Sequence, residues 1–103
     1  MIKHIVMWKL HDFAEGMTKK ENALRMKLWL EDLKTKIPDI QHLEVGINFN
    51  QSDDAYDIVL YSVFKDKASL EAYQNHPDHI RFKGQIKNVR SEKKVVDYEI
   101  PGL

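Results

Sequence analysis

Hydrophobic and polar positions alternate along three segments of the chain, which predicts β-strands at residues 2–10, 42–49 and 56–64. In the first and third segments both alternating sets are largely apolar, which is typical of strands covered on two faces. Segment 42–49 sets apolar positions against polar ones, which indicates an edge strand with one face in water. A fourth strand is expected at about residues 94–100.

A long helix is predicted between the first two strands, after a loop at residues 11–17. Thr18 and Glu21 have the spacing of a capping box, and Pro38 marks the end of the helix. Six apolar residues fall on one face at the helical period, and we expect that face to pack on the core: Ala23, Met26, Trp29, Leu30, Leu33 and Ile37.

A second helical segment precedes the last strand and is interrupted by a proline. Asp66 is placed to cap a short helix that runs to Asn75. Pro77 cannot continue that helix, but it suits the first turn of a new one, which His76 is placed to cap. In the new helix His79 shares one side with apolar residues and is expected to face inward with them: Phe82, Ile86 and Val89.

The resulting order is strand, helix, strand, strand, helix, strand, which predicts an α+β fold of the ferredoxin-like βαββαβ type with a four-stranded antiparallel sheet. In this fold the first and third strands are central, as their apolar faces require. Helices cover one face of such a sheet. Because the central strands are apolar on both faces, we expect a second copy of the chain to cover the other face, which gives a homodimer.

Composition narrows the function classes. We expect a single domain over residues 1–103, since this length suffices for one core. Sixteen basic and sixteen acidic side chains balance, so net charge predicts attraction to neither nucleic acid nor a membrane. The chain has no cysteine, which excludes disulfides and thiolate metal sites. Without a recognisable signal peptide or an apolar run of spanning length, the expected location is the cytoplasm.

Four stretches of the chain resemble the stress-responsive A/B barrel domain family, Dabb. They are Met1 to Lys9, Tyr56 to Tyr61, the Tyr-x-x-His-Pro-x-His segment from Tyr73 to His79, and Val95 to Tyr98. The resemblance covers essentially the whole chain and implies a dimeric α/β barrel. Members include stress-associated proteins, proteins without an assigned function and a plant polyketide cyclase.

The resemblance also nominates site residues. In cyclase-like members, a histidine at the position of His79 is the base, a tyrosine at the position of Tyr73 assists, and a histidine matching His4 lies near the pocket. The chain departs from that pattern at Asp57, where the cyclase has a further histidine, and this departure argues against a shared substrate.

Two functions remain open at this point. In one, His79 and Tyr73 are catalytic in a cofactor-independent proton transfer or aldol reaction, because a neutral imidazole can accept a proton near pH 7. In the other, the chain is a non-catalytic binding module whose His79 and Tyr73 are packed structural residues. That module would use either the same pocket or only its dimer surface. The pocket is expected to take a small, partly apolar carbonyl compound, with His4, Trp8 and Phe82 as candidate binding residues. His4 could equally be a satisfied core histidine.

Other chemistry has weaker support. His76 and His79 have a workable spacing for a metal, but no third ligand lies near them in sequence, so we expect neither a metal nor a cofactor. Residues 80–94 are rich in Lys and Arg, which could indicate RNA binding. Because the third strand lacks the aromatic, glycine-containing motif of ferredoxin-like RNA binders, a solvated helix face is the preferred interpretation.

Overall fold

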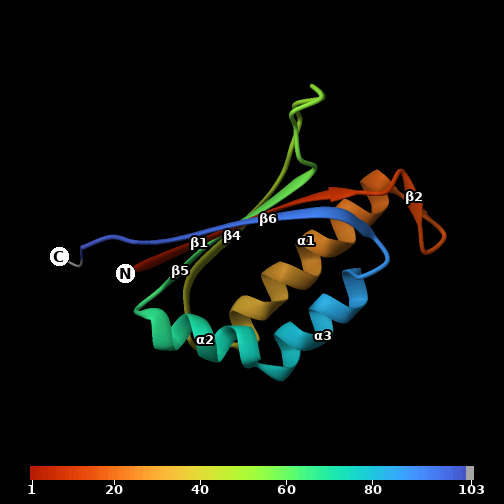
Figure 1. The fold of residues 1–103 in the computed structure, drawn as a ribbon. Coiled ribbons are helices and arrows are strands. Elements are labelled where there is room, and N and C mark those ends of the chain that lie inside the picture. Colours follow the sequence, from red (N-terminus) through yellow and green to blue (C-terminus); the bar gives the residue numbers. More distant parts are fainter. Residues whose placement is uncertain (102–103) are drawn as a thin grey trace.

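The computed structural model describes residues 1–101, and its four main strands form one antiparallel sheet (Figure 1). The order across the sheet is β4 (Ile40–Ile47), β5 (Ile58–Phe64), β1 (Ile2–Leu10) and β6 (Arg90–Glu99). The first and third predicted strands are therefore central, and the ferredoxin-like α+β prediction is confirmed. The last strand begins at Arg90, four residues before the expected start at 94, because pairing with β1 extends through the charged stretch.

Three helices cover one face of this sheet (Figure 1): α1 (Lys19–Lys36), α2 (Lys67–Asn75) and α3 (Pro77–Ile86). The predicted capping box opens α1. The Thr18 hydroxyl accepts a hydrogen bond from the Glu21 amide at 3.2 Å, and the Glu21 carboxylate accepts one from the Thr18 amide at 3.0 Å. These two bonds satisfy amides that have no partner within the helix, so α1 starts where the sequence predicts.

The predicted break between the second and third helices is also confirmed. Asp66 caps α2 by accepting a hydrogen bond from the Ser69 amide at 2.8 Å. His76 ends α2 and caps α3, where the Asp78 amide donates to His76 Nδ1 at 3.1 Å, and Pro77 occupies the first helical position. A histidine therefore performs the capping that a serine or aspartate usually performs, and this capping fixes the start of α3.

Residues 11–17 are expected as a plain loop, and that expectation is wrong. A short hairpin begins there, formed by β2 (Phe13–Ala14) and β3 (Met17–Thr18). Glu15 and Gly16 at its turn both have positive φ angles, 53° and 74°, as a tight hairpin turn requires. The buried side chain of Asn22 donates to the Ala14 carbonyl at 3.0 Å, which ties the hairpin to α1. This hydrogen bond joins residues eight positions apart and has no recognisable sequence pattern.

The hydrophobic core lies between the sheet and the helices. The apolar face predicted for the first helix packs against this core: five of its six residues are buried, and Trp29 is half-buried. Among the described residues, no helix lies over the opposite sheet face (Figure 1). There Val96 and Tyr98 are 52% and 44% exposed, and Ile5 and Met7 are half-buried. Within residues 1–101, no helix combines the length and apolar character needed to cross a membrane.

Candidate active-site cavity

A cavity of about 570 Å³ lies between the helices and the sheet, and it brings the sequence-predicted residues together. His4 and Trp8 reach it from β1, Tyr73 from the last turn of α2, and His79 and Phe82 from α3. These five residues are separated by up to 78 positions in the sequence. The antiparallel pairing of β1 within the sheet and the turn at Pro77 place them around one space.

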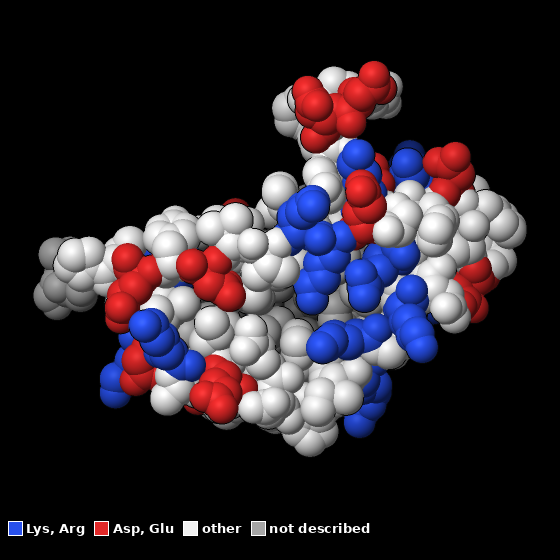
Figure 2. Space-filling model, viewed as in Figure 1, with Lys and Arg blue, Asp and Glu red and all other residues white. Residues whose placement is uncertain are grey.

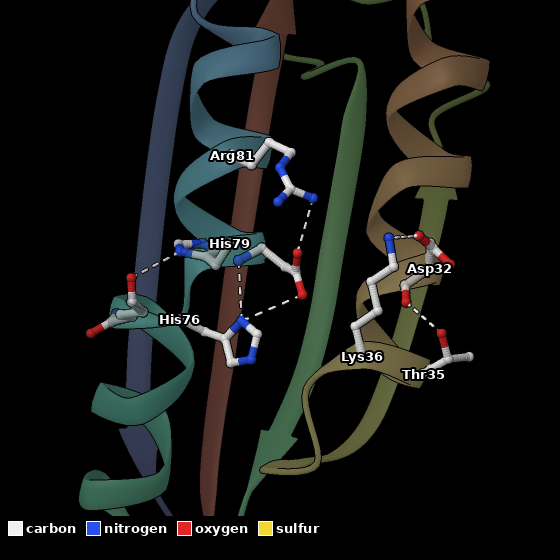
Figure 3. A network of polar contacts seen from close by, with 8 residues as sticks. Asp32, Thr35, Lys36, His76, His79 and Arg81 are labelled. Atoms are coloured by element: carbon white, nitrogen blue, oxygen red, sulfur yellow. Dashed lines mark hydrogen bonds and ion pairs between the residues drawn. The ribbon is translucent and has the colours of Figure 1, made fainter.

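His79 is held in a defined protonation state. Its Nδ1 lies 3.1 Å from the Gln74 carbonyl oxygen at the end of α2 (Figure 3). A carbonyl oxygen only accepts, so Nδ1 carries the hydrogen and Nε2 keeps its lone pair. Burial lowers the pKa of His79 to about 4; the Gln74 bond opposes this, and the charges of Lys83 and Lys93 add to it. At neutral pH the imidazole is therefore neutral, with Nε2 able to accept a proton.

The Tyr73 hydroxyl is buried without a hydrogen-bond partner among the described residues. The residue is only 1% exposed, and its ring centroid lies 4.4 Å from that of His79 and 5.0 Å from that of Phe64. Burial raises the pKa of Tyr73, so the hydroxyl remains protonated and can donate a hydrogen bond.

Trp8, on strand β1, also carries a buried donor without a partner in residues 1–101. This donor is the indole Nε1, and the ring packs edge-on against Phe82 with centroids 6.2 Å apart. Buried donors without partners are rare in folded proteins because they lose their hydrogen bonds to water. Two of them on side chains that line one cavity make this cavity the best candidate site.

His4 combines both of the roles left open by the sequence. It lines the cavity, with its ring centroid 6.0 Å from that of Tyr73, and it is satisfied on its other side by a short hydrogen bond from Nδ1 to Asp97 Oδ1. His4 and Asp97 are directly opposite in the pairing of β1 with β6. The carboxylate orients the imidazole. Sequence reasoning missed Asp97 because the register between strands 93 residues apart has no local signal.

Two residues singled out from the sequence lie outside the cavity. His76 caps α3, which is the structural role expected for it. Asp57, at which the chain departs from the cyclase pattern, accepts a hydrogen bond from the Leu10 amide at 2.7 Å and lies 3.7 Å from Lys19 Nζ. It borders a different surface hollow of about 740 Å³, whose described lining contains neither histidine nor tyrosine. That hollow is larger, and its titratable lining consists of Asp57 and three lysines, Lys9, Lys19 and Lys20.

Four basic side chains surround the cavity on the side of α3 and β6: Lys83, Lys87, Arg90 and Lys93. Figure 2 shows Lys and Arg side chains gathered around a hollow in this region. The interpretation of residues 80–94 as one solvated helix face is therefore wrong in part. Arg90 and Lys93 lie on β6, because strand pairing with β1 begins before the predicted position. Within residues 1–101, no group of three His, Cys, Asp or Glu side chains is arranged to hold a metal ion.

Comparison with known proteins gives the chain its family. The stress responsive A/B barrel domain family, Dabb, matches residues 2–100. The stress-response A/B barrel domain-containing protein DABB1 of Arabidopsis thaliana is 27% identical over 103 residues, which cover 95% of this chain and 46% of that protein. The chain thus spans about half the length of this curated relative.

Solved structures agree on the fold. A dimeric protein of unknown function with a ferredoxin-like fold from Bacteroides fragilis is 32% identical, with a TM-score of 0.84 and coverage of 96% of this chain and 95% of that chain. The hydroxynitrile lyase of Passiflora edulis, 14% identical with a TM-score of 0.75 and coverage of 99% and 94%, shares the fold alone. From its sequence match and its fold, this chain belongs to the stress responsive A/B barrel (Dabb) domain family.

Proposed function

We propose that the cavity binds a small, partly apolar carbonyl compound. The observation that carries this proposal is the pair of buried, unpartnered donors, Tyr73 Oη and Trp8 Nε1, on side chains that line the cavity. A ligand carbonyl oxygen that reaches either donor would accept its hydrogen bond. The apolar part of the wall, which includes Val6, Leu60 and Phe82, matches a partly apolar ligand.

A second candidate function is catalysis by proton transfer, and the state of His79 favours it. Its Nδ1 hydrogen bond to the Gln74 carbonyl leaves Nε2 as the acceptor, and the ring lies against Tyr73. In the proposed reaction Nε2 removes a proton from the carbon next to the carbonyl, and the Tyr73 hydroxyl donates to the oxygen on which negative charge develops. The carbanion equivalent then attacks a second carbonyl of the same molecule: the new carbon–carbon bond forms as the π bond of that carbonyl breaks, and its oxygen takes the proton back from His79 Nε2.

The binding proposal is tested by screening small ketones and aldehydes in a thermal-shift assay at fixed protein concentration. A ligand at about ten times its Kd contributes about 1.4 kcal/mol, which raises the melting temperature of a domain this size by roughly 5–10 °C. The response should shrink in His79→Ala and in Tyr73→Phe. It should persist in His11→Ala, which removes an exposed histidine that does not line the cavity. If no hit loses its effect in the cavity variants, the site assignment fails.

Proton transfer is tested separately from binding. A hit with an acidic C–H is incubated with the protein in deuterated water, and exchange of that hydrogen is followed by NMR. Exchange catalysed by the wild-type chain and abolished in His79→Ala supports the enzyme. A ligand that binds but exchanges at the uncatalysed rate supports the non-catalytic binding module instead.

We also propose that the functional unit is a homodimer in which two sheets pack face to face. Support comes from the uncovered sheet face, where Val96 and Tyr98 are exposed beside Ile5 and Met7. The Bacteroides fragilis relative, 32% identical, is described as dimeric. The segment between β4 and β5 projects away from the helices (Figure 1), and on it Phe49 is 96% exposed, as expected of a side chain that contacts a partner.

Sedimentation velocity tests the dimer. We expect a dimer at micromolar concentration for the wild-type chain and a monomer for Val96→Asp, since this change places an unpaired charge in the apolar interface. Glu71→Gln, a change at an exposed position of α2 in the helix layer, serves as the control and should remain dimeric. A monomeric wild-type chain at micromolar concentration would contradict the proposal.

A further inference from the structure

The four basic residues at the cavity come from two elements that converge on it. Lys83 lies on α3 and Lys87 immediately after it, while Arg90 and Lys93 lie on β6. All four residues are exposed to solvent and also line the cavity, so they form its rim. We call this set the basic rim.

The basic rim lacks compensating charge. Within residues 1–101, none of its four side chains lies within 4 Å of a carboxylate, and no Asp or Glu lines the cavity. Elsewhere, Lys9 is paired with Glu92 at 3.5 Å and Arg81 with Asp78 at 3.1 Å. Because the chain as a whole is neutral, this accumulation is local.

The rim residues lie close enough to repel one another. The pKa of Lys93 is lowered, first by partial burial and then by the charges of Lys83 and Arg90, while Asp97 opposes the effect. Asp97 is itself bound to His4 and does not neutralise the rim through a direct contact. Like charges gathered at the mouth of a cavity are unfavourable for folding, and such clefts concentrate anions.

From this arrangement we propose that the natural ligand carries an anionic group, a carboxylate or a phosphate, which the basic rim holds while the apolar and carbonyl parts of the ligand enter the cavity. This inference rests on the proposed function, since it describes a second part of the same ligand. Arg90 provides a planar fork that matches two oxygens of such a group, and the lysines provide mobile point charges.

The inference connects the rim to His79. Four groups around this histidine affect its basicity: the Gln74 carbonyl from α2, Lys83 from α3, Lys93 from β6 and His4 from β1. An anion bound between Lys83 and Lys93 offsets two of the charges that depress the pKa of His79. Burial remains the largest cause that lowers the pKa of His79, so the anion changes only the smaller contribution of the two lysines.

Matched probes test the proposal. γ-Benzoylbutyrate has a phenyl ring, a ketone and a carboxylate separated by a short alkyl chain, and its methyl ester replaces the charged carboxylate with a neutral group that is one methyl larger. Calorimetric titrations of the wild-type chain with both compounds are compared at low and high salt. We expect the acid to bind more tightly than the ester, with an advantage that shrinks as salt increases. Phenyl phosphate as a third probe distinguishes a phosphate from a carboxylate as the preferred group.

The charge variants complete the test. In Lys83→Gln/Lys93→Gln, the affinity for the acid should fall about tenfold, toward that of the ester, because two charge contacts are lost. The affinity for the ester should not change. The matched control is Lys34→Gln/Lys67→Gln, which removes two exposed lysines that do not line the cavity and should leave both affinities unchanged.

The possible failures are distinguishable. Suppose that the ester binds in a His79-dependent manner. If the acid then binds no better than the ester, or if the acid binds Lys83→Gln/Lys93→Gln as tightly as the wild-type chain, the anionic inference is overturned while the carbonyl pocket stands. If the acid and phenyl phosphate bind through the lysines but neither responds to His79→Ala or Tyr73→Phe, the rim stands and the carbonyl pocket fails. If none of the three probes binds, both are overturned.

Discussion

Removal of the Tyr73 hydroxyl should make the protein more stable and its ligand binding weaker. The hydroxyl is buried, has no hydrogen-bond partner in the described residues, and belongs to a side chain that is 1% exposed. A buried hydroxyl without a partner costs about 1–3 kcal/mol. The space vacated in Tyr73→Phe is smaller than a methyl group and costs less than about 1 kcal/mol. The variant is therefore expected to lie between neutral and about 3 kcal/mol more stable than the wild-type chain.

Urea unfolding followed by tryptophan fluorescence measures this change, since the chain contains two tryptophans, Trp8 and Trp29. Protomer concentration must be the same for all variants, because the stability of an oligomer depends on it. Tyr56→Phe is the matched control: it removes a hydroxyl from a half-buried tyrosine that packs under Lys9, outside the cavity, and should change stability by only a few tenths of a kcal/mol.

The result that refutes this reasoning is a loss of about 1 kcal/mol or more in Tyr73→Phe. Such a loss would mean that the hydroxyl is satisfied within the fold and that Tyr73 is a structural residue. A gain in stability together with a weaker thermal-shift response to ligands would instead identify a group kept at a cost to folding because it serves the site.

Three further outcomes are expected. Because burial lowers the pKa of His79 to about 4, below its unfolded value of about 6.5, the stability it contributes is complete above pH 6.5 and is lost as the pH falls toward 4. Urea unfolding at several pH values should show that His79→Gln removes on the order of 1–2 kcal/mol of this acid loss, after allowance for its partial exposure; an unchanged pH dependence would contradict the burial of a neutral imidazole. Asn22→Asp should destabilise the fold by about 2–3 kcal/mol in the same assay, because a carboxylate cannot donate to the Ala14 carbonyl, whereas a neutral result would show that the hairpin does not depend on this bond. Asp57→Ala should cost about 1–3 kcal/mol by leaving the Leu10 amide without its partner, yet leave the thermal-shift response to ligands intact; loss of that response would place Asp57 in the site.

Local elements of the fold could be predicted because their causes lie within a few residues. Thr18 and Glu21 satisfy each other's amides across one turn, and Pro77 stops one helix and starts the next by its ring geometry alone. The strand order also followed, because the central strands must be apolar on two faces. The start of β6 could not be predicted in this way, because residues 90–94 are largely charged and lack the apolar pattern of a strand. They form a strand because β1 pairs with them.

The candidate site divides in the same way. The seven-residue segment from Tyr73 to His79 can be recognised in the sequence, and it indicates both the family and two cavity residues, Tyr73 and His79 themselves. The partner of His4, the unpartnered donors of Tyr73 and Trp8, and the basic rim each depend on where distant elements meet. Asp97 reaches His4 only through the register of two strands at opposite ends of the chain, and Lys93 joins Lys83 only because β6 passes beside α3. Charge and hydrogen bonding at the site act over a few ångströms in space, and the distances that decide them are set by packing rather than by spacing along the chain.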